Sequence, residues 1–164
     1  MVGLLPPRSC FILTSVIGYV IDDKGKYHFW IGRRAATKKS CPNMLDVTVA
    51  GGITARDVPL ETVFRESMEE ASLKPAYLQE RIKAVGLVSY VWASPKGWLC
   101  VSNVFSELVQ IWRDSYPEFQ FIYDLQFPTG QSVVPKPNDD EVESFQLRSA
   151  NEVLQLMLDG EFVA

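Results

Sequence analysis

The sequence predicts a mixed α+β domain in which a mixed sheet packs between helices. Segments with the β-branched and aromatic composition of strands occur before and after a helical segment. Strands and helices therefore do not alternate as they do in a doubly wound fold. The chain has 164 residues, 47% of them hydrophobic and 22% charged, which is enough for one domain with its own core. We expect a single domain over residues 8–164.

The first half of the chain predicts a hairpin, a basic loop and a short strand. Phe11–Ile21 and Tyr27–Arg33 have strand composition and flank the turn sequence Asp-Asp-Lys-Gly, which is typical of a β-hairpin. Arg33–Pro42 is expected to be a basic loop. Val47–Ala50 predicts a short strand that leads into two glycines.

A helix is expected next, with Pro59 in its first turn and helical periodicity over Leu60–Ala71. Pro75 prevents its continuation. At about 100° per residue, six side chains fall on one arc that is expected to face the sheet. They are Leu60, Val63, Phe64, Ser67, Met68 and Ala71.

The second half predicts further strands and a closing helix. Strand composition occurs at Ile82–Trp92, Phe119–Phe127 and Val142–Leu147. Ala150–Leu158 is amphipathic and is followed by Gly160, which is typical of a helix end.

Composition excludes several classes of function. A net charge of −4 and a pI of about 5.0 argue against binding to nucleic acid or anionic lipid, and no apolar run approaches the length needed to span a membrane. Three widely spaced cysteines indicate reduced thiols in a cytoplasmic protein. The single histidine, His28, excludes mechanisms that need several and is expected to be structural. We expect a monomer or homodimer.

The chemistry is expected in the helix at Leu60–Ala71. Glu66, Glu69 and Glu70 stand at positions i, i+3 and i+4 and share one side of the helix. Like charges at this spacing repel by roughly 0.2–0.5 kcal/mol per pair, so the cluster requires a counter-charge. Oxygen-rich clusters suit Mg²⁺ or Mn²⁺, and the backbone carbonyl of Gly51 can join them. A solvated acidic helix face is the alternative; the spaced glycine and Arg65 favour the metal site.

The spacing of these residues resembles the Nudix box: Gly, five residues, Glu, seven residues, then Arg-Glu-apolar-x-Glu-Glu-x-Gly-apolar. The residues that match in register are Gly51, Arg65, Glu66, Glu69, Glu70 and Leu73. Three positions depart from the motif: Asp57 replaces the first Glu, Ser67 the apolar residue and Ser72 the Gly. The resemblance implies a Nudix fold with a loop–helix–loop metal site.

In that family the three helix glutamates ligate the metal, and one of them can also act as the base. The box arginine, here Arg65, orients them through a salt bridge to the first acid. Asp57 is one methylene shorter than Glu, so this bridge is expected to be strained or water-mediated. An additional acid often comes from a later loop; Glu141 and Glu143 are the candidates. Asp139 and Asp140 stand behind them, and a solvated acidic turn is the alternative.

Segments along most of the chain resemble a narrower branch, the Nudix domain of proteins related to thiamine pyrophosphokinase. These segments are Phe29–Arg34, Lys38-Lys39 with Pro42, Met44–Asp46, Val49–Ile53, Glu69–Leu73, Val88–Tyr90, Phe121–Leu125, Pro135–Phe145 and Gly160–Phe162. The branch implies hydrolysis of thiamine diphosphate, or preferentially of its oxidised analogues, to the monophosphate plus phosphate. Residues 99–116 have no counterpart in it and are expected to be an insertion or a surface helix.

Basic and aromatic side chains are candidates for the substrate site. Arg33, Arg34, Lys38 and Lys39 suit substrate phosphates, although two of the four are expected to be only solvated. Trp30, Tyr90 and Trp92 could stack on a pyrimidine or thiazolium ring; the alternative for each is a place in the core.

Three functions are alternatives to hydrolysis of thiamine diphosphate. Isopentenyl diphosphate isomerase has a similar scaffold, but its metal site relies on several histidines and this chain has one. A hydrolase of other nucleoside diphosphate derivatives would share the metal site and differ in the pocket walls. A catalytically inactive diphosphate-binding module would not need all three glutamates.

Overall fold

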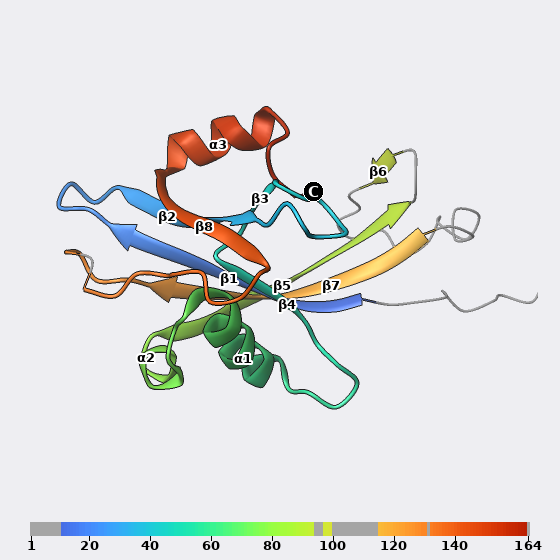
Figure 1. Ribbon diagram of the computed structural model, residues 1–164, viewed down its shortest axis with the longest axis horizontal. Coiled ribbons are helices and arrows are strands. Elements are labelled where there is room, and N and C mark those ends of the chain that lie inside the picture. The colour runs from blue at the N-terminus through green and yellow to red at the C-terminus, as the bar shows by residue number, and fades with distance from the viewer. Residues whose placement is uncertain (1–10, 94–96, 100–114, 131, 164) are drawn as a thin grey trace, which may run out of the picture.

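The computed structural model describes residues 11–93, 97–99, 115–130 and 132–163. Its described part contains one sheet and three helices (Figure 1). The strands are β1 (Phe11–Ile21), β2 (Tyr27–Arg34), β3 (Leu45–Asp46), β4 (Val49–Gly52), β5 (Ile82–Ala93), β6 (Gly97–Leu99), β7 (Ser115–Gln126) and β8 (Val142–Ser149). The helices are α1 (Pro59–Ala71), α2 (Pro75–Gln79) and α3 (Ala150–Leu158).

Strand β1 is the centre of an eight-stranded mixed sheet in the order β3-β2-β1-β7-β5-β6. It runs parallel to β7 and antiparallel to β2 and β4; β4 pairs with its first half and β2 with its end. Strand β8 pairs with the outer side of β2. Helices α1 and α2 lie on one side of the sheet and α3 on the other (Figure 1). The predicted mixed sheet between helices is confirmed.

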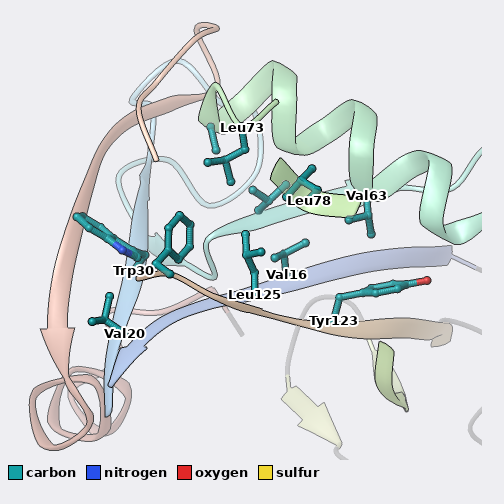
Figure 2. Packing of buried hydrophobic residues seen from close by; sticks show 11 residues of the cluster. Val16, Val20, Trp30, Val63, Leu73, Leu78, Tyr123 and Leu125 are labelled. Carbon is teal, nitrogen blue, oxygen red and sulfur yellow. The ribbon is translucent and has the colours of Figure 1, made fainter. Parts of the chain in front are cut away.

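The core lies between the sheet and the α1–α2 pair (Figure 2). Val16, Leu125 and Phe127 contribute from the sheet side, and each is at most 1% exposed. The helices and the segments that follow them contribute the fully or almost fully buried Val63, Ala71, Leu73 and Leu78.

The face that α1 buries differs from the expected arc. Leu60 and Met68 are 38% and 51% exposed, whereas Thr62 and Glu70 are buried together with Val63, Ser67 and Ala71. The prediction for Leu60 and Met68 was wrong because apolarity alone assigned them to the sheet. The helix is instead rotated so that a carboxylate, Glu70, faces strand β4.

Local signals set the helix ends. Pro59 opens α1, and Ser72 ends it in the left-handed conformation (φ 56°), so the serine takes the role for which the family motif uses glycine. Pro75, which was expected to prevent continuation of α1, lies shortly after this end and opens the short α2, which was not predicted. Helix α3 begins at a capping box formed by Ser149 and Glu152.

Strand boundaries differ at a few places. The strand expected at Val47–Ala50 is observed as β4, shifted to Val49–Gly52, and the unpredicted β3 precedes it. Strand β7 begins at Ser115, four residues before Phe119. Most of the expected insertion at 99–116 lies outside the described residues. Within the described ranges, no helix has the length and apolarity to cross a membrane.

Replacing a buried leucine should lower stability far more than replacing an exposed leucine on α3. We expect Leu125→Ala to lower the free energy of unfolding by about 2–5 kcal/mol, because Leu125 is completely buried and its truncation leaves a cavity. The matched control is Leu154→Ala on α3, where the side chain is 58% exposed and the change should stay within about 0.5 kcal/mol. Urea unfolding of the two variants measures both. Equal losses would contradict this description of the core.

Candidate functional site

The site begins where α1 crosses β4. Gly51 lies on β4 opposite Thr14 of β1, and the Glu66 side chain packs directly on its Cα. A Cβ at Gly51 would lie 2.1 Å from Glu66 Cγ and 2.6 Å from Glu66 Oε1, well below any real contact distance. The glycine is therefore required by close approach, and it allows a helix carboxylate to lie against the strand backbone. The Gly51 carbonyl also accepts a 3.4 Å hydrogen bond from Thr14 Oγ1.

Glu70 is the most deeply buried acid of the site, with 8% of its surface exposed. Its Oε2 accepts a hydrogen bond of 3.2 Å from the Ala50 backbone N–H. Burial raises the pKa of Glu70 to about 8, since the charged form loses its hydration. The Ala50 hydrogen bond lowers it, and the negative charges of Glu66, Asp46 and Asp139 raise it further.

Arg65 organises the remaining acids. Its guanidinium lies 2.8 Å from Glu66 Oε1, 3.4 Å from Glu69 Oε2 and 3.8 Å from Asp57 Oδ2. Burial raises the pKa of Glu66, Arg65 opposes this shift, and the charge of Glu69 adds to it. Glu69 is the most exposed of the three helix glutamates.

The salt bridge between Arg65 and the first acid of the box is the longest of the three. Asp57 is held instead by the Thr54 hydroxyl, which donates to Asp57 Oδ2 at 2.7 Å. The shorter aspartate therefore stays near the arginine without a close ion pair.

Two pairs of oppositely charged side chains line the same cavity as Glu70. Lys38 forms an ion pair with Glu141, and Arg34 forms one with Asp46 at 2.9 Å. Arg33 donates to the Asn43 carbonyl at 2.6 Å. This small cavity lies between the charged pairs and helix α1. Its charged lining residues are Arg33, Arg34, Lys38, Asp46, Glu70 and Glu141.

The structure brings together most, but not all, of the residues that the sequence singled out. Lys39 and Glu143 are exposed and do not line the cavity. Trp30, a candidate for stacking on a ring with the core as the alternative, is buried in the core and meets Phe127 edge to face at 6.3 Å between ring centroids. The candidate role in substrate binding is corrected to a place in the core, because the side chain on β2 packs among buried apolar residues. His28 contacts Asp22 at 3.2 Å, far from the cavity lining.

Three contributors were missed: Asp46, Lys136 and Asn138. Asp46 lies in the cavity lining through the strand β3 that the sequence did not predict. Asn138 donates through Nδ2 to the Met68 carbonyl at 3.0 Å, and the Lys136 N–H donates to the Ala71 carbonyl at 3.0 Å. These bonds dock the segment before β8 on the end of α1 and bring the acids that follow towards Glu70. No local pattern indicates such long-range contacts.

The carboxylate oxygens of the site are donors that suit a hard divalent cation, but their side chains are not arranged around a common point. Among the described residues, no three His, Cys, Asp or Glu side chains are grouped so that they could hold a metal ion. In their present rotamers Glu66 and Glu69 turn to Arg65. The buried Glu70, the crowding of acids around it and the Gly51 space filled by Glu66 nevertheless give an all-oxygen donor set that suits Mg²⁺ or Mn²⁺.

Comparison with known proteins identifies the family. The family model described as the NUDIX domain matches residues 12–162. The chain belongs to the Nudix family. The Nudix fold expected from the box is thereby confirmed, and the family supports the predicted class of enzyme, a hydrolase of pyrophosphate bonds.

Relatives agree with this assignment. An uncharacterised Saccharomyces cerevisiae protein, YJR142W, is 40% identical over 146 residues, which are 88% of this chain and 40% of that protein. Nudix hydrolase 24, chloroplastic, of Arabidopsis thaliana is 33% identical over 147 residues, 90% of this chain and 34% of that one. The Nudix chain thus spans two fifths or less of these relatives.

The fold also matches a solved structure. The crystal structure of DR0079 from Deinococcus radiodurans superposes with a TM-score of 0.61 at 19% sequence identity. The match covers 99% of this chain and 83% of that chain, and it establishes the arrangement of the sheet and helices.

Adding one methyl group at Gly51 should disable the site. We expect Gly51→Ala to lower kcat/KM for a diphosphate substrate on the order of 100-fold, because the new Cβ displaces Glu66. Gly52→Ala is the matched control. The nearest atom to its Cβ would be Leu13 Cδ2 at 4.0 Å, an ordinary contact, so its activity should stay near that of the wild type. Unaltered activity in Gly51→Ala would show that this close approach is unimportant.

Glu70 should make the metal-free protein less stable as pH rises. Its folded-state pKa of about 8 exceeds the ordinary value of 4.5, so between these values the folded protein binds more protons than the unfolded chain. The contribution of Glu70 to stability is full below pH 4.5 and is lost as pH rises through 8, by on the order of a few kcal/mol. Chemical unfolding at several pH values in the presence of EDTA measures it. Glu70→Gln should have a flatter profile than the wild type, and parallel profiles would contradict the shift.

Proposed function

We propose that this Nudix domain hydrolyses the diphosphate linkage of a small molecule with the help of Mg²⁺ or Mn²⁺. The observation that carries the proposal is that one cavity is lined by the helix carboxylate Glu70 and by the basic side chains of Arg33, Arg34 and Lys38. Negative groups that suit a metal and positive groups that suit phosphate oxygens are the two requirements of this reaction.

Each group has a proposed part. Glu66, Glu69 and Glu70 would hold the metal, together with the Gly51 carbonyl and an acid from the segment before or within β8, with Glu141 better placed than Glu143. A bound divalent ion would neutralise phosphate oxygens and make a coordinated water more acidic. Arg33, Arg34 and Lys38 would orient the phosphates, and Arg65 would position Glu66 and Glu69.

The proposed substrate is thiamine diphosphate or an oxidised analogue, cleaved to the monophosphate and phosphate. Support comes from the branch-like segments along the chain and from their place in the fold. Met44–Asp46 and Pro135–Phe145 supply Asp46 and Glu141 to the cavity, so segments typical of the branch line the proposed reaction site.

Phosphate release with and without Mg²⁺ tests the proposal. We expect Mg²⁺-dependent release from thiamine diphosphate and oxythiamine diphosphate, and a loss on the order of 100-fold in kcat for Glu69→Gln, because a metal ligand is removed. Glu61→Gln is the matched control, since Glu61 is exposed in the first turn of the same helix.

Two further substrates sharpen the result. ADP-ribose and a deoxynucleoside triphosphate should be cleaved more slowly than the thiamine compounds. Faster cleavage of these nucleotides would keep the hydrolase and refute the thiamine assignment. A folded protein that releases phosphate from no substrate, with or without Mg²⁺, would refute the hydrolase itself.

A further inference from the structure

Four polar side chains form a hydrogen-bonded cluster on the sheet beside the reaction site. The Tyr90 hydroxyl on β5 donates to Glu118 on β7. Gln120 Nε2 donates to Tyr90 Oη and to Glu118 Oε1, each at 2.9 Å, and the Ser15 hydroxyl on β1 donates to Gln120 Oε1 at 3.3 Å. Three strands thus contribute to this cluster, which we term the acceptor cluster.

The acceptor cluster faces away from α1, and its Ser15 lies on the strand next to the cavity residue Ala50. Ser15 alternates with Val16, which is packed in the core against α1, so Ser15 points to the opposite face. In the ladder between β1 and β4, Ser15 lies directly opposite Ala50, which lines the cavity next to Glu70. Gln120 pairs with Leu13, two residues along β1 from Ser15. With strands about 4.8 Å apart and a rise of about 3.3 Å per residue, the Gln120 backbone lies roughly 12 Å from Ala50.

The electrostatics also link the two places. Burial raises the pKa of Tyr90 well above its usual range, and the Glu118 side chain raises it further. Asp46, which lines the cavity, has a smaller effect in the same direction. The strand register sets the separation that a ligand with its phosphates in the cavity must span to reach Tyr90 and Glu118 with its other end.

The hydrogen-bonding groups left over in the acceptor cluster are mainly acceptors. One N–H of the Gln120 amide is shared between Tyr90 Oη and Glu118 Oε1, and the Tyr90 hydroxyl proton is used on Glu118. Glu118 Oε1 accepts two bonds, while Glu118 Oε2 has no hydrogen-bond partner among the described residues. Gln120 Oε1 accepts one bond and has a second lone pair. Groups with this pattern select a ligand that donates.

An apolar surface lies beside these acceptors. Val88 stands directly opposite Gln120 in the β5–β7 ladder and is 49% exposed. A flat ring can rest on Val88 and present its edge to Glu118, an arrangement of apolar contact with a few directed polar groups that is typical of small-molecule sites.

We propose that Glu118 and Gln120 determine specificity by accepting hydrogen bonds from N–H groups of a nitrogen heterocycle carried by the diphosphate substrate. The inference rests on the proposed function for the reaction itself and adds the residues that recognise the ring attached to the diphosphate. Tyr90 is a positioning residue, since it fixes the Glu118 carboxylate.

The test compares a substrate with the ring and one without it. Thiamine diphosphate carries an amino group on a nitrogen heterocycle, whereas methyl diphosphate has no ring. We expect Glu118→Gln to lower the ratio of kcat/KM for thiamine diphosphate to that for methyl diphosphate about tenfold, because an amide N–H2 replaces one acceptor oxygen. Glu80→Gln on α2 is the matched control and should leave the ratio unchanged, because Glu80 pairs with Arg81 away from the acceptor cluster. An unchanged ratio in Glu118→Gln would overturn the inference and show that the acceptor cluster has only a structural role.

A binding measurement separates failure of this inference from failure of the proposed reaction. Calorimetric titration with thiamine monophosphate needs no turnover. Binding that weakens about tenfold in Glu118→Gln would support the acceptor cluster even if neither diphosphate is hydrolysed. Equal affinity in the wild type and the variant, or no binding to either, would overturn it whatever the hydrolytic activity.

Discussion

The burial of one carboxylate, Glu70, governs how the domain is built around its site. A glutamate with 8% exposure loses most of its hydration, and its pKa of about 8 expresses that cost. A single backbone hydrogen bond, from Ala50, partly offsets it. The helix is turned to make this contact, and in consequence Leu60 and Met68 remain exposed on its other side. This orientation of α1 therefore buries an acid at the expense of apolar side chains, which makes the helix packing less stable.

The remaining parts of the site follow from the same helix orientation. With Glu70 against Ala50, Glu66 falls one turn earlier and lies on the next strand residue, which only glycine accommodates. The carbonyls at the end of α1 are then free to receive the Lys136 and Asn138 donors. This docking carries Glu141 to Lys38, so that an acid just before β8 meets bases from the end of β2 and the loop after it at one cavity.

The sequence predicted what depends on local pattern and missed what depends on contacts between distant segments. Strand β1 and helix α3 match their expected bounds because turn residues and periodicity mark both ends. The predicted buried face of α1 was wrong. A hydrophobicity pattern assigns a buried position to Met68 in preference to Glu70, whereas in the structure Glu70 is buried and Met68 is exposed. Asp46 and the partnership of Glu118 with Tyr90 arise only from strand pairing, which no spacing along the chain encodes.

The two halves of the site differ in how freely their residues can change. On the α1–β4 side, Gly51 and Glu66 are in direct contact and Glu70 is buried, so most substitutions there disturb the fold of the site. On the β5–β7 side, Val88, Glu118 and Gln120 are partly exposed side chains on regular strands. Their replacement alters donors and acceptors without moving the backbone. Strand β1 joins both halves through Thr14 and Ser15. The proposed diphosphate site and the proposed recognition surface are thus separable, because different strands of one sheet carry them.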